Sequence, residues 1–335
     1  MLFFGRNYAI VINMCSIKLL DCTLREGGYV NNWEFGAENI QNILYGLKNA
    51  HIDFIECGYL KPVSYSSNKT LFNTINDAEK LTAEHNIKPV LMINYGEYNI
   101  KDIPNQKNII FRIAFKKHQA DEALKYCTKL KSKGYGIFIN PMHTNTYSAN
   151  ELSELINEVN KILPYGFTIT DSTGSMRETD LKRVIKICKG LNENINICFH
   201  SHNNMQLSFS NAQYFIKNCL DRNIIIDSTL SGIGRGAGNL CTEIIALYLN
   251  NFCKGSYDIN PILESIEMCI KPVFDKNPWG YSVPYYLSGL NNCHPDYAKF
   301  LINKSLSYDR INDILKKIPA DMKSTYNEYL IKQLI

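Results

Sequence analysis

The chain has 335 residues, 45% of them hydrophobic, which suffices for one large domain with an appendage or for two ordinary domains. Its 36 basic and 32 acidic side chains leave a net charge of +4, too mild to indicate a nucleic-acid partner, and no basic stripe interleaved with aromatics is present. No stretch approaches the roughly 20 apolar residues of a membrane span, so we expect no membrane association.

The cysteines and the N-terminus indicate a cytoplasmic protein. The eleven cysteines are odd in number, form no CxxC pair and often lie in apolar runs, a pattern typical of reduced, buried thiols. Residues 1–14 are apolar but are interrupted by Arg6 and Asn7, and they lack a basic n-region and a small-residue cleavage site. The sequence therefore predicts no signal peptide.

Short apolar runs without strict polar alternation recur along the chain, and this pattern is typical of parallel strands buried on both faces. The predicted strands are 17–22, 53–58, 89–94, 109–115, 135–140, 167–171, 195–200 and 224–229. Between them, helical spacing predicts helices at 37–50, 119–133, 150–163, 178–191 and 240–252, the third of these preceded by a good N-cap, Ser148.

Eight strand-then-helix units predict an α/β protein with a closed (β/α)8 TIM barrel over residues 1–252. The alternative, an open doubly wound sheet, usually has fewer strands and a glycine-rich turn after the first. From about residue 253 the chain becomes rich in Pro, Asn and Tyr, and it ends in an amphipathic helical pattern at 311–334. We expect residues 253–335 to form a C-terminal helical extension packed on the barrel.

Catalytic groups of a barrel come from the C-terminal ends of its strands. The first strand runs into Arg25 and Glu26, followed by Gly27 and Gly28, which suits a loop whose backbone approaches a bound group. The alternative is a surface salt bridge beside a flexible turn. The seventh strand ends in His200 and His202, which point to the same side because strand residues two apart share a face.

Two co-directed imidazoles and one carboxylate form a ligand set for a divalent transition metal with open positions. The glycine-rich loop 232–239 after the eighth strand, which includes Gly234, could hold an anion through backbone N–H groups. Its place after the last strand argues against a dinucleotide fingerprint. Asn239 could be either an N-cap or a metal ligand.

Other polar residues at strand ends are candidates for substrate binding. Asp171 and Ser172 end the sixth strand, Glu56 lies on the second, and Arg112 on the fourth. An inward-pointing Arg112 could hold a carboxylate with two parallel hydrogen bonds. Each of these residues alone is more often structural.

Three motifs together resemble the signatures of the DRE-type TIM-barrel metallolyases, an HMGL-like family that includes 4-hydroxy-2-oxovalerate aldolases, HMG-CoA lyases and the isopropylmalate and homocitrate synthases. They are LDCTLREGG at 20–28, FHSHNN at 199–204 and GIGRGAGN at 232–239. The resemblance covers roughly residues 17–250. The segment GYSVPYYLSG at 280–289 resembles the aldolase tail, in which a tyrosine reaches the active site.

The resemblance implies roles for individual residues. Glu26 takes the place of the acidic metal ligand, His200 and His202 match the two histidine ligands, and Asn239 matches the position of a further ligand. Arg25 matches the arginine that stabilises the enolate oxygen. The implied reaction cleaves or forms a 4-hydroxy-2-oxo acid through a metal-bound pyruvate enolate, with the metal acting as Lewis acid.

One departure concerns the base. The aldolases carry a histidine shortly after the first motif, where this chain has Tyr29. Because an unperturbed tyrosine has a pKa near about 10, Tyr29 is a poor base unless its environment changes it. Tyr29, or a tyrosine of the tail (Tyr281, Tyr285 or Tyr286), could act through a water molecule.

Other departures bear on the reaction class. The chain lacks the acidic residue of the synthases in the loop after the eighth strand and the cysteine loop of the acyl-CoA lyases, so an aldolase is favoured. A Claisen-type acyl-CoA-dependent condensing enzyme is the alternative, and a barrel that binds metal without catalysis is a third reading. The ligand set suits Mn²⁺ best, with Mg²⁺, Co²⁺ or Zn²⁺ as alternatives.

We expect the partners to be a 2-oxo acid and an aldehyde. The apolar tail makes a homodimer plausible. The longer tail with which some aldolases dock a dehydrogenase is missing, so no such partner is expected.

Overall fold

A computed structural model describes residues 16–105 and 108–335. The N-terminal segment for which no signal peptide is predicted, residues 1–14, lies outside the described residues. Within the described part, no helix has the length and apolar character needed to cross a membrane.

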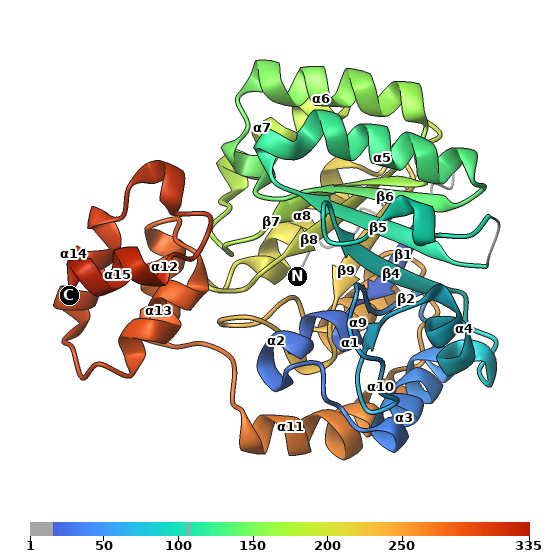
Figure 1. Cartoon of the computed structure of the whole chain (residues 1–335), viewed down its shortest axis with the longest axis horizontal. Helices are drawn as coiled ribbons and strands as arrows, with labels where there is room; N and C mark the ends of the chain where they lie inside the picture. Colours follow the sequence, from blue (N-terminus) through green and yellow to red (C-terminus); the bar gives the residue numbers. More distant parts are fainter. Residues whose placement is uncertain (1–15, 106–107) are drawn as a thin grey trace, which may run out of the picture.

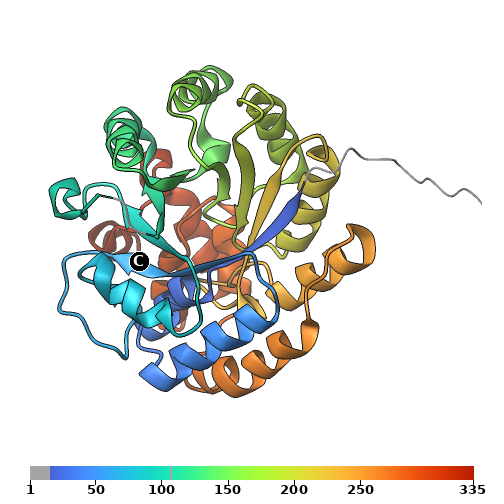
Figure 2. The ribbon, with the colours of Figure 1, turned by 90° about the vertical axis from the view of Figure 1, so that its right-hand side faces the viewer.

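Eight parallel strands close into a barrel, and this confirms the predicted (β/α)8 fold (Figures 1 and 2). In spatial order each strand pairs with its neighbour, and the first and second strands close the ring through two residue pairs, Leu20 with Phe54 and Asp21 with Ile55. The barrel strands are β1 Ile17–Asp21, β2 Phe54–Leu60, β4 Pro89–Asn94, β5 Ile110–Phe115, β6 Gly136–Pro141, β7 Gly166–Asp171, β8 Asn196–Ser201 and β9 Ile224–Ser228. A short ninth strand, β3 Leu71–Phe72, pairs with β2 outside the ring.

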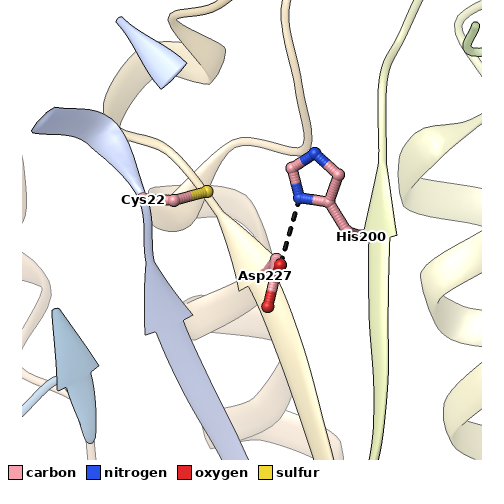
Figure 3. A group of neighbouring side chains, drawn as sticks. All are labelled: Cys22, His200 and Asp227. Atoms are coloured by element: carbon pink, nitrogen blue, oxygen red, sulfur yellow. Dashed lines mark hydrogen bonds and ion pairs between the residues drawn. The ribbon is translucent and has the colours of Figure 1, made fainter. Parts of the chain in front are cut away.

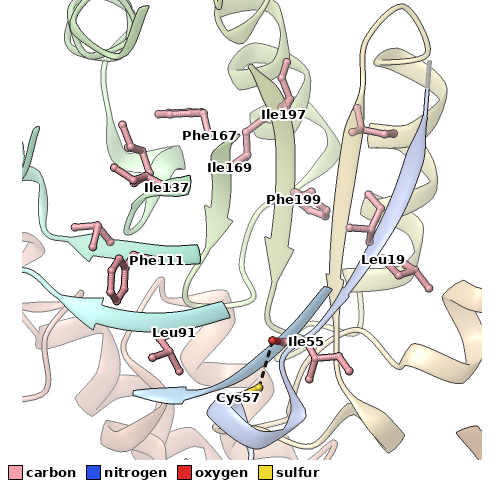
Figure 4. Close-up of a cluster of buried hydrophobic side chains, with 14 of the residues drawn as sticks. Leu19, Ile55, Cys57, Leu91, Phe111, Ile137, Phe167, Ile169, Ile197 and Phe199 are labelled. Atoms are coloured by element: carbon pink, nitrogen blue, oxygen red, sulfur yellow. Dashed lines mark hydrogen bonds between the residues drawn. The ribbon is translucent and has the colours of Figure 1, made fainter. Parts of the chain in front are cut away.

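Alternation along the strands divides the apolar side chains into two layers. One set faces outward and packs under the surrounding helices, as Leu91, Phe111 and Phe199 do in Figure 4. The other set fills the barrel interior and forms a separate apolar cluster of Leu20, Cys22, Val90, Ile110, Phe138, Cys198 and Ile225. Nearer the C-terminal ends of the strands, the cavity is lined by polar residues such as Asn140 and His200 as well as by Met92 and Ala114, so the polar groups lie at the end where catalytic groups of a barrel are found.

The helices surround the strands, as Figure 2 shows from one end of the barrel. They are α3 Ala37–Asn49, α4 Ile75–Ala83, α5 Ala120–Ser132, α6 Ala149–Ile162, α7 Glu178–Cys188, α8 Ser208–Asn218 and α9 Thr242–Phe252. Ser148 caps α6 as predicted, through a capping box in which its side chain accepts from the Glu151 N–H and its own N–H donates to the Glu151 carboxylate. Between β4 and β5 the described residues form only a 3₁₀ turn, η1 Ile100–Asp102, so this unit departs from the predicted pattern.

The end of the chain divides between two apolar cores. The first part, α10 Ile259–Ser265, the π-helical turn η5 Ile266–Ile270 and α11 Lys271–Lys276, adds Ile262, Cys269 and Ile270 to the barrel's core cluster. The second part has its own cluster and stands to one side of the barrel in Figure 1. Its helices are α12 Val283–Leu290, α13 Pro295–Ile302, α14 Tyr308–Lys317 and α15 Glu328–Leu334. The division of the chain at residue 252 stays a prediction.

The amphipathic pattern predicted at 311–334 is not one helix. Helix α14 ends at Lys317, Pro319 follows Ile318, and only the 3₁₀ turn η6 Ala320–Met322 precedes α15. Proline lacks the N–H that the next helical turn would need, and it disfavours helical geometry in the residue before it. The chain between the two helices is therefore free to turn back over the barrel.

Candidate metal centre

The first strand leads into two short helical turns, α1 Thr23–Glu26 and α2 Gly28–Asn31, where the sequence predicted a loop. The N–H of Glu26 donates to the Cys22 carbonyl, which closes the first turn and points the Arg25 and Glu26 side chains into the barrel mouth. A Cβ on Gly28 would overlap the Trp33 ring, so this position requires glycine. Both charged side chains are buried and do not form a surface salt bridge.

The imidazoles of His200 and His202 lie together, as their spacing on β8 predicts. Their ring centroids are 5.3 Å apart. Potential ligand atoms of Glu26, His200 and His202 all lie within 4.8 Å of one another, and all three side chains are buried. Burial lowers the pKa of both histidines, so both imidazoles are neutral, the form that binds a metal ion.

Asp227 on β9 orients His200 (Figure 3). Its Oδ2 lies 3.1 Å from His200 Nδ1, while His200 Nε2 lies 3.5 Å from a Glu26 oxygen. A carboxylate accepts the Nδ1 proton, so the neutral ring keeps its lone pair on Nε2, on the Glu26 side. Cys22 also lies near this pair, but its thiol donates to the Ser228 carbonyl at 3.3 Å and burial raises its pKa well above the ordinary value. A neutral thiol is a poor ligand, so a cation belongs with Glu26 and His202.

Unpartnered buried atoms fit a cation at this position. Glu26 Oε2, His202 Nδ1 and Asn239 Oδ1 are buried and have no hydrogen-bond partner. Buried polar atoms are rarely left unsatisfied, because each one costs about 1–3 kcal/mol. All three atoms can donate a lone pair, and a divalent ion bound by two imidazoles and a carboxylate would satisfy them. The residues present therefore fit a divalent metal.

Asn239 lies beside this group and does not cap a helix. The N-cap of α9 is Cys241, and the Asn239 amide donates to the Ile233 carbonyl at 3.0 Å. A Cβ on Gly234 would overlap the Asn239 amide and lie 3.5 Å from Glu26 Oε2, so Gly234 allows the loop to approach both side chains. Asn239 as a metal ligand and Gly234 as a substrate-binding residue stay predictions.

Beneath the ligands, buried charges form one network. Arg25 contacts Glu26, and its Nε donates to Glu56 at 3.0 Å. Arg112, which is fully buried, lies 3.4 Å from Glu56 and holds Asp227 through both terminal nitrogens, one of them at 3.0 Å. The prediction that Arg112 binds a substrate carboxylate does not fit this placement, since the carboxylate that it holds belongs to the protein.

We expect Arg112→Met to lower the free energy of unfolding by about 3 kcal/mol, because it leaves Asp227 buried without its cation, whereas Glu56 keeps Arg25. Denaturant titration at neutral pH measures this loss. A matched control is Arg183→Met, since Arg183 donates only to backbone carbonyls of Tyr147 and Asn145. Equal losses in the two variants would show that pairing of Arg112 with carboxylates contributes nothing to the free energy of unfolding.

The metal candidates open into a cavity of about 220 Å³ at the C-terminal ends of the strands. Arg25, Tyr29, Ser172 and both histidines line it, and their roles in catalysis and binding stay predictions. The Tyr29 hydroxyl lies 2.6 Å from that of Tyr59. Burial raises the pKa of Tyr59 well above its ordinary value, so Tyr59 remains protonated and can exchange a hydrogen bond with Tyr29.

Two predicted residues lie away from the cavity. Asp171 accepts hydrogen bonds at 3.0 Å from the backbone N–H groups of Ser175 and Met176, which orders the loop after β7. Tyr281 is 61% exposed and does not line the cavity. It precedes α12, which packs within the second core, so the tail segment that resembles the aldolases does not deliver this tyrosine.

The sequence analysis missed the outer wall of the cavity. Lys116, His143, Arg235 and His294 line it, together with the segment Ser324–Tyr326 from the break between α14 and α15. The only signals in the sequence were the strand ends before Lys116 and His143 and the proline before the C-terminal segment. Tyr326, and not Tyr281, is the tail tyrosine at the cavity.

Comparisons with known proteins agree with the geometry. A model of the HMGL-like family matches residues 16–264. The chain is 27% identical over 274 residues to a 4-hydroxy-2-oxovalerate aldolase of Geobacillus genomosp. 3, with 78% of each chain covered. It is 21% identical over 236 residues to an oxaloacetate decarboxylase of Mycobacterium tuberculosis, with 69% of each covered. The solved N-terminal domain of a Bacteroides vulgatus protein described as an aldolase superimposes with a TM-score of 0.76 at 28% identity, over 86% of this chain and 97% of that one.

Proposed function

The chain belongs to the HMGL-like family, and from this we propose that it is a divalent-metal-dependent carbon–carbon lyase that cleaves or forms a 4-hydroxy-2-oxo acid. The family match confirms the resemblance that the three sequence motifs carry. The aldolase relatives support the reaction class, and the size of the cavity suits a 2-oxo acid with a small aldehyde. Mn²⁺ remains the metal that we favour.

One observation carries the proposal. Glu26, His200 and His202 converge beside Arg25, whose Nη2 is buried without a partner and whose side chain lines the same cavity. The ligand lone pairs of Glu26 and His202 thus lack a donor or a cation, and the Arg25 Nη2 donor lacks an acceptor. A metal-bound 2-oxo acid would provide both missing partners, because the metal binds the ligand atoms and an oxygen of the 2-oxo acid accepts from Arg25.

Glu26, His200 and His202 would hold the metal, which would supply Lewis-acid polarisation of the 2-oxo group. Arg25 donates from Nη2 to the oxygen on which negative charge develops as the enolate forms, and Glu26 and Glu56 fix its guanidinium before the substrate arrives. Tyr29 lies on the same wall with Tyr59 hydrogen-bonded behind it, and we assign to its hydroxyl oxygen a hydrogen bond from the 4-hydroxyl group, which orients that group for loss of its proton to a water molecule. Burial keeps bulk water away from these groups.

The test is exchange of the pyruvate methyl protons in deuterated water, followed by NMR with a series of divalent metals. We expect exchange that depends on metal and is abolished by a chelator, because enolate formation needs no aldehyde. An aldehyde screen then follows carbon–carbon bond formation. No exchange with any metal contradicts the proposal, and release of free thiol from acetyl-CoA in the presence of a 2-oxo acid assigns the Claisen reaction instead.

Oxaloacetate decarboxylation is a second candidate, because one relative is named for that activity and the reaction also yields a pyruvate enolate. The two differ in the leaving group, which is CO₂ in one case and an aldehyde in the other. Metal-dependent loss of oxaloacetate without any aldol product from the aldehyde screen would favour the decarboxylase.

A further inference from the structure

The outer end of the cavity carries two cations without a carboxylate partner. Lys116 follows β5, and Arg235 lies in the glycine-rich loop after β9. Among the described residues, neither side chain forms an ion pair with Asp or Glu. Arg235 instead lies over the Tyr29 ring, 3.8 Å from its centroid, which fixes the guanidinium at the cavity wall.

Two histidines at this end of the cavity, His143 and His294, are neutral and hydrogen-bond to neighbouring residues. Arg235 Nη1 lies 2.7 Å from His294 Nε2, and because a guanidinium only donates, the imidazole accepts and carries no charge. Burial, followed by the charge of Arg235, lowers the pKa of His294 to about 2. Burial also lowers the pKa of His143 to about 4, while its ring bonds the Ser324 backbone. The immediate partners of the Arg235 guanidinium are therefore neutral, and the nearby Asp296 carboxylate lies on the other side of His294, 3.7 Å from its Nδ1.

The C-terminal segment closes the same end. Ser324, Thr325 and Tyr326 line the same cavity as Lys116 and Arg235, so three residues with hydroxyl side chains lie along its wall. The segment is anchored on Tyr297, whose hydroxyl donates to the Thr325 and Met322 carbonyls at 2.9 and 3.0 Å. The C-terminal segment, which lies outside the barrel, thus supplies hydroxyl groups that are able to donate hydrogen bonds to an anion.

The 2-oxo acid at the inner end does not supply the missing charge. There, Arg25 and Arg112 are matched by Glu26, Glu56 and Asp227. A divalent ion and the carboxylate of a 2-oxo acid together add one positive charge, so they leave the potential at the outer end no less positive. A cavity of this kind attracts a second anionic group beside Lys116 and Arg235.

We propose that Lys116 and Arg235, with the hydroxyls of Ser324 and Thr325, bind a second anionic group, a carboxylate or a phosphate, on the aldehyde that the enzyme joins to or releases from pyruvate. This inference rests on the proposed function and narrows its substrate to 4-hydroxy-2-oxo acids that carry a second negative charge at the end distal to the metal.

The test compares aldehydes in condensation with pyruvate on the metal-loaded, full-length enzyme. Succinic semialdehyde carries a carboxylate, glyceraldehyde 3-phosphate carries a phosphate, and propanal is uncharged. We expect kcat/KM for one of the anionic aldehydes to exceed that for propanal. Arg235→Gln should lower the anionic value about 10- to 100-fold, the range of a hydrogen bond to a charged group. Lys116→Gln should lower it about 2- to 5-fold, because this side chain is more exposed.

The neighbouring Lys117→Gln is the matched control, since Lys117 pairs with Glu151 outside the cavity and should not change the preference. Lys116→Arg should restore most of the loss in Lys116→Gln. A wild-type enzyme that prefers propanal, or equal losses for charged and uncharged aldehydes in Lys116→Gln, overturns the proposal.

A binding measurement separates this inference from the proposed reaction. Calorimetric titration of sulfate and of butyrate into the metal-loaded enzyme measures anion binding at the outer end without turnover. Sulfate replaces the phosphate group in this experiment, and butyrate replaces the carboxylate. Binding that weakens about 2- to 5-fold in Lys116→Gln and not in Lys117→Gln supports the anion site even if pyruvate exchange fails. Equal binding in all variants refutes it even if exchange succeeds.

Discussion

His202→Ala is expected to strip the enzyme of its divalent ion and to reduce pyruvate proton exchange by at least about 10³-fold, since Lewis-acid stabilisation is worth several kcal/mol. His202 Nδ1 has no hydrogen-bond partner, so removal of the ring costs only its hydrogen bond to the Arg235 backbone. His202 is therefore a cleaner target than His200, whose loss would also leave Asp227 without one of its partners. Metal content by mass spectrometry of the purified protein, together with exchange by NMR, measures both effects.

The matched control for this variant is Ser201→Ala. Ser201 is the neighbour on β8, points to the opposite face, and has a buried hydroxyl without a partner. Its removal should leave metal content and exchange close to those of the wild type. Wild-type metal content in His202→Ala would remove this residue from the ligand set.

Arg25→Lys is expected to lower turnover by about 10²- to 10³-fold while the metal content stays the same, because a lysine ammonium keeps the charge but not the planar fork. The lysine can still pair with Glu26 or Glu56, so the buried carboxylates are not left alone. What is lost is the unpartnered Nη2 that faces the cavity. Steady-state kinetics should show the loss mainly in kcat, since the contact forms as charge develops.

Thermal unfolding of Arg25→Lys separates a catalytic loss from a folding defect. A variant with wild-type melting temperature, wild-type metal content and low kcat supports the assigned role. Unchanged kcat would exclude Arg25 from the mechanism, and a loss that appears only in KM would make it a ground-state binding residue.

Local patterns sufficed to predict most of the barrel. Each of the eight apolar runs became a strand within one or two residues, because a parallel strand covered on both faces must be apolar throughout. The two-residue period also placed His200 and His202 on one face. Both features depend only on residues that are close in sequence, so they could be predicted from the sequence alone.

Features that depend on distant contacts were missed. Arg112 looked like a substrate ligand, because nothing near it in sequence reveals that Asp227, 115 residues away, already holds its guanidinium. The outer wall contains His143, His294 and Tyr326, which come from three different parts of the chain. Their association depends on how the second core docks, and no periodic pattern encodes that.

Tyr281 and Tyr326 show how a resemblance can mislead locally. The tail segment at 280–289 suggested a tyrosine in the active site, but Tyr281 is exposed, and α12 after it packs within the second core. Pro319 instead follows the end of α14, and beyond it residues 324–326 line the cavity. The proline was visible in the sequence, whereas the direction of the chain after it was not.

The most direct test of this account is a crystal structure of the enzyme grown with Mn²⁺, with anomalous scattering measured to locate the ion. The account predicts one strong anomalous peak at the C-terminal end of the barrel, about 2.0–2.3 Å from a Glu26 oxygen and from one nitrogen each of His200 and His202. A peak elsewhere, or none at these three side chains under saturating Mn²⁺, would contradict it.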